Sequence, residues 1–164
     1  MKKLKLIVFI AIILLTGCNR TVTCSNQYIT PAFIGFSISD IDTLIIREYK
    51  KDDNFLHLND TILIINDPHV ASYTTSNDTT IVVLNVISGE SKYILPDHDW
   101  QIYIPAKKMT IEISNIISPQ TEYACFKCGC INPINTFVQN GQTMIPQSKN
   151  IPYFGNGYLT YIHR

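Results

Sequence analysis

The cysteines are the side chains whose type and spacing could carry chemistry. Cys125, Cys128 and Cys130 lie within CFKCGC, and Cys24 lies about a hundred residues earlier. Four thiolates could form a tetrahedral site for zinc or copper(I). Cys125 and Cys128 also have the two-residue spacing of a dithiol oxidoreductase, with Lys127 beside them to favour a thiolate. Two structural disulfides are the third interpretation, because four cysteines can pair completely.

The residues around this cluster favour disulfides over redox exchange. A redox CxxC normally opens a helix after a strand, whereas SPQ (118–120) precedes this cluster and NP (132–133) follows it, and both indicate a loop. Cys24 has only the late cluster to pair with. Three connectivities remain open, and a bridge from Cys24 would stabilise the fold by up to about 4–5 kcal/mol.

The histidines offer a weaker candidate for chemistry. His98 lies between two carboxylates in DHDW (97–100), whereas His57, His69 and His163 are isolated from one another. Such residues can form a general base or a metal site. However, none has a ligand-spaced partner, and Pro96-Asp97 indicates a turn that enters a strand. The chain has no nucleophile elbow, phosphate-binding loop or dinucleotide motif, so we expect neither an enzyme nor a bound cofactor or metal.

The N-terminus has the order of residues found in a secretory signal. Lys2, Lys3 and Lys5 precede an uncharged apolar run from Leu6 to Leu15, and Thr16-Gly17-Cys18 follows. Ten helical residues extend about 15 Å, half of a roughly 30 Å hydrocarbon core. The run therefore predicts an export signal over residues 1–17 and not a permanent membrane span.

Leu15-Thr16-Gly17-Cys18 resembles the lipobox of bacterial lipoproteins. The resemblance implies cleavage before Cys18, a diacylglyceryl group on its sulfur and acylation of the new amino group with chains such as palmitate. Each buried methylene contributes about 0.8 kcal/mol, so two or three chains hold a protein on a bilayer. Asn19 is not the aspartate that retains many lipoproteins in the inner membrane, which predicts an outer-membrane location, and no acidic cluster follows, which favours the periplasmic face.

Composition describes the rest of the chain as one β-rich domain. Removal of the signal leaves 147 of the 164 residues, with ten basic against thirteen acidic side chains and a formal charge near −3. No basic patch is visible, so a nucleic-acid partner is not expected. Low charge with nine Tyr, seven Phe and many Ile, Val and Thr favours strands. We expect a lipidated tether over 18–25 and a single domain over 26–164.

Short strands are predicted throughout this domain, as in an antiparallel β-sandwich or barrel. The expected strands are 33–36, 43–49, 61–65, 79–87, 92–95, 100–104, 110–116, 135–139, 143–145 and 158–163. Residues 100–104 and 110–116 alternate apolar with polar side chains and should form an antiparallel pair. Asn140-Gly141 predicts a type I′ hairpin, because both residues accept a positive φ. ILII (62–65) and IVVL (81–84) are apolar on both faces and suit central strands.

Three segments repeat at an interval of eighteen residues: DTLII (42–46), DTILI (60–64) and DTTIV (78–82). A β-meander whose turns end in Asp and whose strands begin with Thr would produce this repeat. Asp-Thr followed by an aliphatic residue or Thr also resembles the O-glycosylation sequon of exported Bacteroidota proteins. That resemblance implies sugars on Thr43, Thr61 and Thr79 if each is exposed.

The whole chain resembles small lipoproteins of Bacteroidota. The resemblance rests on the lipobox at 15–18, on DWQIYIPAKKMTIEI (99–113) and on CGCINPINTF with NGQ (129–142). We therefore expect a disulfide-stapled, lipid-anchored envelope protein that binds a protein or glycan partner or serves in assembly. The alternative is a thiol-redox or metal-binding envelope protein that acts through Cys125, Cys128 and Cys130.

Overall fold

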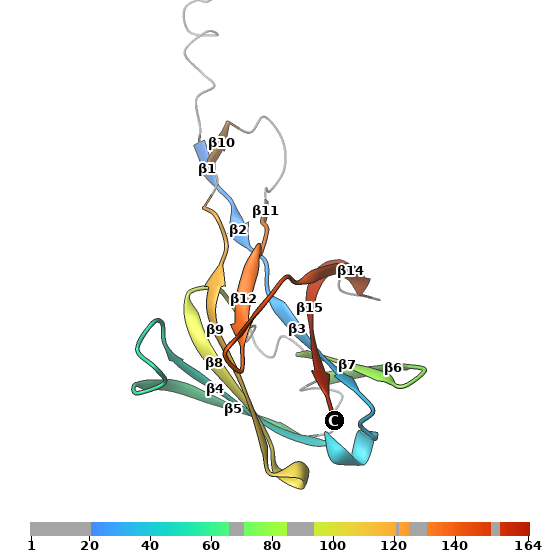
Figure 1. Ribbon diagram of the computed structural model, residues 1–164. Coiled ribbons are helices and arrows are strands. Elements are labelled where there is room, and N and C mark those ends of the chain that lie inside the picture. The colour runs from blue at the N-terminus through green and yellow to red at the C-terminus, as the bar shows by residue number, and fades with distance from the viewer. Residues whose placement is uncertain (1–20, 66–70, 85–93, 121, 125–130, 152–154) are drawn as a thin grey trace, which may run out of the picture. The chain divides into compact units, whose positions relative to one another are not determined.

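The protein is almost entirely β-structure. The computed structural model describes residues 21–65, 71–84, 94–120, 122–124, 131–151 and 155–164 (Figure 1). Within these ranges the regular elements are strands and two short 3-10 helices, η1 (Ile38–Asp40) and η2 (Pro105–Lys107). By contact clustering the chain forms two compact units, one of residues 1–25 with 120–132 and one of residues 26–119 with 133–164.

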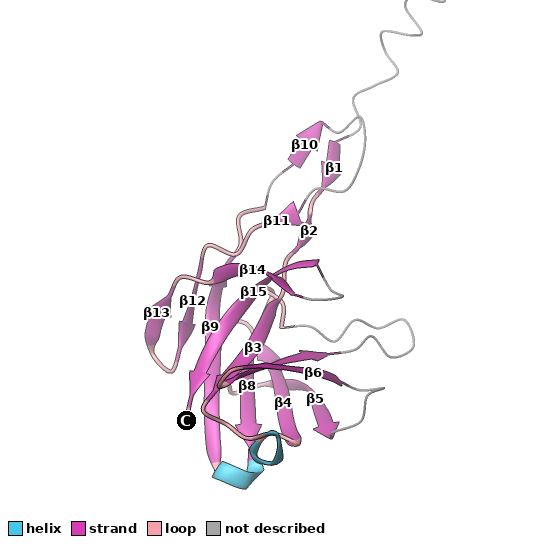
Figure 2. Ribbon diagram, turned by 90° about the vertical axis from the view of Figure 1, so that its right-hand side faces the viewer, coloured by secondary structure: helices cyan, strands magenta, loops and turns pink. Residues whose placement is uncertain are grey.

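The larger unit is a β-sandwich, which confirms the predicted fold class. In spatial order, the six-stranded sheet contains β13 (Gln142–Met144), β12 (Thr136–Gln139), β9 (Met109–Ile117), β8 (His98–Ile104), β4 (Thr43–Lys50) and β5 (Leu58–Ile65). The five-stranded sheet contains β14 (Gln147–Ile151), β15 (Gly155–His163), β3 (Ile29–Ile34), β7 (Thr79–Leu84) and β6 (Ala71–Ser76). Pairing is antiparallel except between β15 and β3, which run parallel (Figure 2).

The smaller unit contains two short ladders. β1 (Thr21–Thr23) pairs with β10 (Glu122–Ala124), and β2 (Ser25–Asn26) pairs with β11 (Ile131–Asn132). The Asn132 side chain is fully buried, and its amide donates to the Cys24 carbonyl at 3.1 Å. Part of the segment predicted as a tether is therefore strand, and the single domain over 26–164 stays a prediction. Sequence distance hid this grouping, since β10 and β11 pair with strands about a hundred residues earlier.

The core of the sandwich follows the predicted alternation. Trp100, Ile102 and Ile104 of β8 are at most 2% exposed, and Trp100 and Ile102 lie opposite Ile113 and Ile111 of β9. Phe33 of the other sheet, also buried, belongs to the same core cluster. β-branched and aromatic side chains cover a pleated surface well, so these strands pack face to face around a continuous apolar layer.

Both predicted hairpins form. β8 turns into β9 through η2 and Lys108, which has φ +50°. β12 turns into β13 through Asn140 (φ +48°) and Gly141 (φ +80°). Asn140 also bonds to the neighbouring strand, because its N–H donates to the Glu112 carbonyl at 3.0 Å and its Oδ1 accepts from the Glu112 N–H at 2.8 Å. The turn is therefore attached to β9 as well as to its own hairpin.

Gly141→Ala should lower the free energy of unfolding by about 1 kcal/mol. A methyl group added at position 141 would meet no atom within 4 Å, so the expected loss comes from the left-handed backbone alone. Urea unfolding measures it, with Thr143→Ala in the adjacent strand as the control that should change little. A loss of several kcal/mol would contradict this account, since it would require a steric clash.

Two topological expectations were wrong. β5 contains ILII but lies at an edge of the six-stranded sheet, whereas β7, with IVVL, is flanked by β3 and β6 as expected. The three repeated segments do not form one meander, because β4 and β5 are neighbours while β7 belongs to the other sheet. In β5 only Ile62 and Ile64 are buried, while Leu63 and Ile65 are exposed, so an apolar stretch reveals neither how many faces of a strand are covered nor how many neighbours it has.

Candidate functional site

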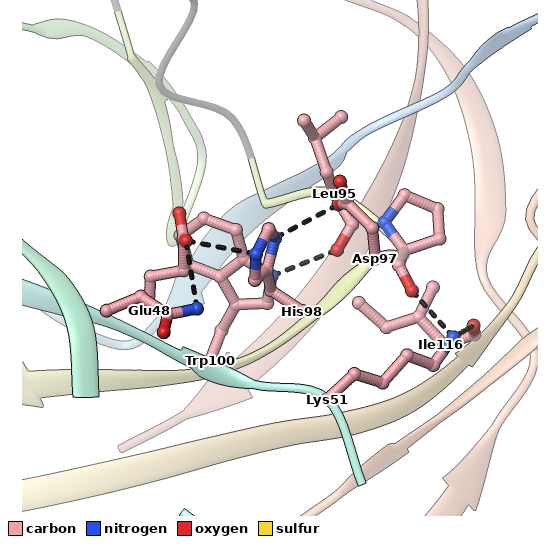
Figure 3. A network of polar contacts seen from close by, with 9 residues as sticks. Glu48, Lys51, Leu95, Asp97, His98, Trp100 and Ile116 are labelled. Atoms are coloured by element: carbon pink, nitrogen blue, oxygen red, sulfur yellow. Dashed lines mark hydrogen bonds and ion pairs between the residues drawn. The ribbon is translucent and has the colours of Figure 1, made fainter. Parts of the chain in front are cut away.

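The segment that enters β8 is held by polar contacts at the end of the sandwich (Figure 3). The Trp100 indole N–H donates to the Leu95 carbonyl at 2.9 Å, which closes a turn around the buried Pro96. The Lys51 ammonium, just beyond β4, donates to the Pro96 carbonyl at 2.7 Å and to the Ile116 carbonyl at 3.3 Å. One lysine therefore joins this turn to β9.

His98 is the residue of this segment with most catalytic potential, and both of its ring nitrogens have partners. Nε2 lies 3.2 Å from a Glu48 carboxylate oxygen, and Nδ1 lies 3.2 Å from one of Asp97. The ring meets Trp100 edge to face, with centroids 6.1 Å apart (Figure 3). A general base needs a nitrogen that can accept a substrate proton. Carboxylates at both nitrogens instead favour a ring that fixes the turn.

Asp99 is a buried carboxylate with a structural role. Its side chain is 2% exposed and accepts from the Asp52 N–H at 2.9 Å and the Asn115 N–H at 3.3 Å. Both donors have a left-handed backbone, with φ +59° and +47°. Asn115 lies where the register between β9 and β12 shifts, so Asp99 holds a β-bulge and the β4–β5 loop together. Burial raises the pKa of Asp99, and the two N–H donors oppose that rise.

The outer face of the six-stranded sheet carries an organised row of polar and aromatic side chains. The Tyr49 hydroxyl donates to the Gln101 Oε1 at 3.0 Å, and the Gln101 amide donates to Glu112 at 3.1 Å. The Arg47 guanidinium lies 5.8 Å from the Tyr103 ring centroid, a distance suited to a cation–π contact. These side chains hold one another in place, so the face presents preorganised groups to solvent.

The cysteine predictions fall largely outside the described residues. Cys18, Cys125, Cys128 and Cys130 all lie there, so lipidation, metal binding and redox exchange stay predictions. Cys24 is described: it is 5% exposed and disulfide-bonded. The connectivity, and with it the stapling of the fold, stays a prediction. Within the described ranges no group of three or more His, Cys, Asp or Glu side chains could hold a metal ion.

The three proposed glycosylation sites differ in exposure. Thr61 on β5 is exposed, whereas Thr43, at the start of β4, and Thr79, at the start of β7, are only partly exposed. The Thr61 N–H donates to Asp60 Oδ1 at 2.8 Å, and the Thr79 hydroxyl approaches Asp78 at 3.4 Å. Of the three, Thr61 alone meets the condition of full exposure.

The remaining histidines are not assembled into a site. His57 lies in the β4–β5 loop, where its Nδ1 is 2.8 Å from Asp53, and its side chain is 74% exposed. Burial tends to raise the pKa of Asp53, but hydrogen bonds from the His57 side chain and from the Leu56 and His57 N–H groups together lower it. His163 is exposed at the end of β15, and His69 lies outside the described residues.

Sequence reasoning found DHDW (97–100) but missed its partners. Glu48 and Lys51 reach this segment because β4 pairs with β8 in a register that sets Glu48 opposite Trp100 and Lys50 opposite His98. No motif joins these residues, which are about fifty positions apart in the chain. The only sequence signal for these contacts was that the two segments were predicted strands that could pair. That signal could not fix the register between β4 and β8, which are separated in the chain by β5, β6 and β7.

No protein-family model, curated protein or solved structure matches the chain. In the part of the chain described here, no helix has the length and apolar character needed to cross a membrane.

Proposed function

We propose that this protein is a lipid-anchored component of the bacterial cell envelope, attached through Cys18 to the outer membrane and facing the periplasm. The observation that carries the proposal is the order of basic residues, apolar run and Leu15-Thr16-Gly17-Cys18 at the N-terminus. β1 begins at Thr21, three residues after Cys18. Three extended residues span at most about 10 Å, so the first strand of the smaller unit begins close to the anchoring residue.

We further propose that the anchored protein binds an envelope protein or glycan, or serves in assembly, and does not catalyse a reaction. Two observations support this role. The carboxylates of Glu48 and Asp97 lie at the two nitrogens of His98, where a substrate would have to bind if the ring were a base. The outer face of the six-stranded sheet carries the ordered row that includes Tyr49, Gln101 and Tyr103, which suits recognition by a rigid surface.

Replacing Cys18 by serine tests the anchor. Because serine has no sulfur to accept the diacylglyceryl group, the Cys18→Ser protein should leave the washed membrane fraction, and cleavage of its signal should stop or change. Cell fractionation with mass spectrometry of the processed N-terminus measures both effects. Thr21→Ser in β1 is the matched control and should remain acylated and membrane-bound. A Cys18→Ser protein that stays in washed membranes, processed as before, would falsify the proposal.

The binding role needs a separate experiment, because anchoring alone does not demonstrate it. A photo-reactive amino acid at Tyr103, on the outer face, should cross-link a defined envelope protein or glycan in intact cells. The same amino acid at Ala106, an exposed residue of η2, serves as the control for random collisions. Equal cross-linking patterns from the two positions would remove the outer face as the binding surface.

A further inference from the structure

Exposed aliphatic side chains gather on one strand edge of the sandwich. In the part of the chain described here, eight large apolar residues are exposed, and four of them lie between positions 56 and 65: Leu56 (76%), Leu58 (53%), Leu63 (56%) and Ile65 (48%). Three of the four belong to β5, the last strand of the six-stranded sheet on its side (Figure 2). Leu63 and Ile65 lie on the same face of the regular end of this strand, and exposed aliphatic side chains grouped in this way are typical of an interaction surface.

Beyond a bulge near its start, β5 lacks the features that normally prevent strand edges from pairing. Edge strands are usually short, or they carry lysine, proline or a bulge. The segment Asp60–Ile65 contains neither lysine, arginine, proline nor glycine. A register shift opposite Glu48 and Tyr49 puts a bulge at Asn59, so regular strand begins at Asp60. The six residues Asp60–Ile65 extend for about 20 Å.

The other described strand edges are better protected. At the opposite side of the same sheet, β13 is three residues long. In the five-stranded sheet, β6 ends in Thr75 and Ser76, which are exposed and polar, and β14 at the other edge contains Lys149. Only β5 combines length with aliphatic side chains on both faces, since Ile62 and Ile64 point into the core while Leu63 and Ile65 point outward. The strand that pairs best with such an edge is one that also carries aliphatic side chains on both its core-facing and its outward face.

Charge and register indicate that this other strand is β5 of a second copy. Asp60 is the only charged residue of the segment and lies at one end. Antiparallel pairing centred on Leu63 sets the two Asp60 carboxylates at opposite ends of the contact, whereas parallel pairing in register would set them side by side. A two-fold axis perpendicular to the sheet also keeps core-facing residues opposite core-facing ones and outward residues opposite outward ones.

We propose that two copies of the protein associate through antiparallel pairing of Asp60–Ile65 with the same segment of the partner copy. The contact joins two six-stranded sheets into one continuous sheet. Leu63 lies near the two-fold axis and meets its own counterpart. Ile45 of β4, opposite Leu63 and partly exposed, widens the outward aliphatic row at the junction. The interface is isologous, so it closes at two copies and does not propagate.

Sedimentation of the purified full chain in detergent tests the proposal. The wild-type protein should sediment with twice the polypeptide mass, and Leu63→Lys should weaken self-association at least tenfold, because an edge lysine in one copy meets a lysine in the other. Leu63 is outward, so circular dichroism and thermal unfolding of the variant should match the wild type. Thr75→Lys places the same charge on the β6 edge and should leave the dimer intact.

Photo-cross-linking in cells identifies the partner strand. A benzophenone amino acid at position 63 should yield a product of two copies joined near β5, whereas the same amino acid at position 75 should not. Four outcomes would overturn the proposal. The wild-type protein could be monomeric at about 100 µM, or the Leu63→Lys protein could dimerise as tightly as the wild type. The protein could also form large polydisperse species, or position 63 could cross-link only to a different protein. The Cys18→Ser protein should still dimerise, so failure of the anchor and failure of the dimer are distinguishable.

Discussion

Trp100→Ala is expected to lower the free energy of unfolding by about 3–5 kcal/mol, a large fraction of the stability of an ordinary domain. Trp100 is 2% exposed and is one of the largest fully buried side chains of the described core. Alanine would leave a cavity between the two sheets and would also remove the donor to the Leu95 carbonyl. The turn that precedes β8 would then lose one of the contacts that close it.

Urea unfolding of two further variants separates these contributions. Trp100→Phe keeps much of the volume but loses the indole N–H, so its cost should be clearly smaller than that of alanine. Tyr103→Ala removes an aromatic ring from the same strand on the outer, partly exposed face. It should cost less than half as much as Trp100→Ala. Equal losses at positions 100 and 103 would show that the core does not lie between the sheets as described.

Asp99→Ala should cost about 2–4 kcal/mol, because two backbone N–H groups lose their acceptor in a buried site. These are the groups of Asp52 and Asn115, both in left-handed conformations that the carboxylate helps to hold. Asp99→Asn keeps one acceptor oxygen and should cost about half as much. Asp97→Ala is the matched control, since the Asp97 side chain is 57% exposed, and removal of an exposed carboxylate costs at most about 1 kcal/mol.

The penalty of Asp99→Ala should also depend on pH. Burial raises the pKa of Asp99 above the ordinary value of 3.8, so the folded state binds the proton more tightly than the unfolded chain. This contribution to stability is fully present below the ordinary pKa and is lost as the pH rises through the raised value. The difference in unfolding free energy between wild type and variant should therefore be larger near pH 4 than at pH 7. A smaller difference on acidification would mean that the two N–H donors outweigh burial.

Local patterns predicted the elements of the fold that depend on neighbouring residues. Alternation in residues 100–104 and 110–116 identified a strand pair, and Asn140-Gly141 identified a hairpin, because side-chain periodicity and turn conformation are local properties. β6 (ASYTTS) and β14 (QSKNI) were missed, since neither has a clear apolar alternation. Their strand conformation comes from pairing with β7 and β15, which supply the backbone partners.

The candidate site could likewise be predicted only where it depends on residues that are neighbours in sequence. DHDW was visible as a turn that enters a strand, and β8 does begin at His98. Lys51 and Glu48 carried no signal, because their relevance depends on the register between β4 and β8. The edge position of β5 was also hidden, since its neighbours are decided by the order of strands across the whole sheet and not by its own residues.

The parallel pair at the centre of the five-stranded sheet affects how the chain reaches its folded state. Tyr158 lies beside Ile29 and His163 beside Ile34, so β3 acquires one of its two neighbours only from residues 129 positions later in the chain. Contacts this distant in sequence close large loops and form slowly. A chain that leaves the ribosome from its N-terminus therefore cannot complete this layer until β15 has emerged. If the chain is exported as we propose, such delayed closure keeps the polypeptide unfolded during translocation and leaves Cys18 accessible to the modifying enzymes before the sandwich forms.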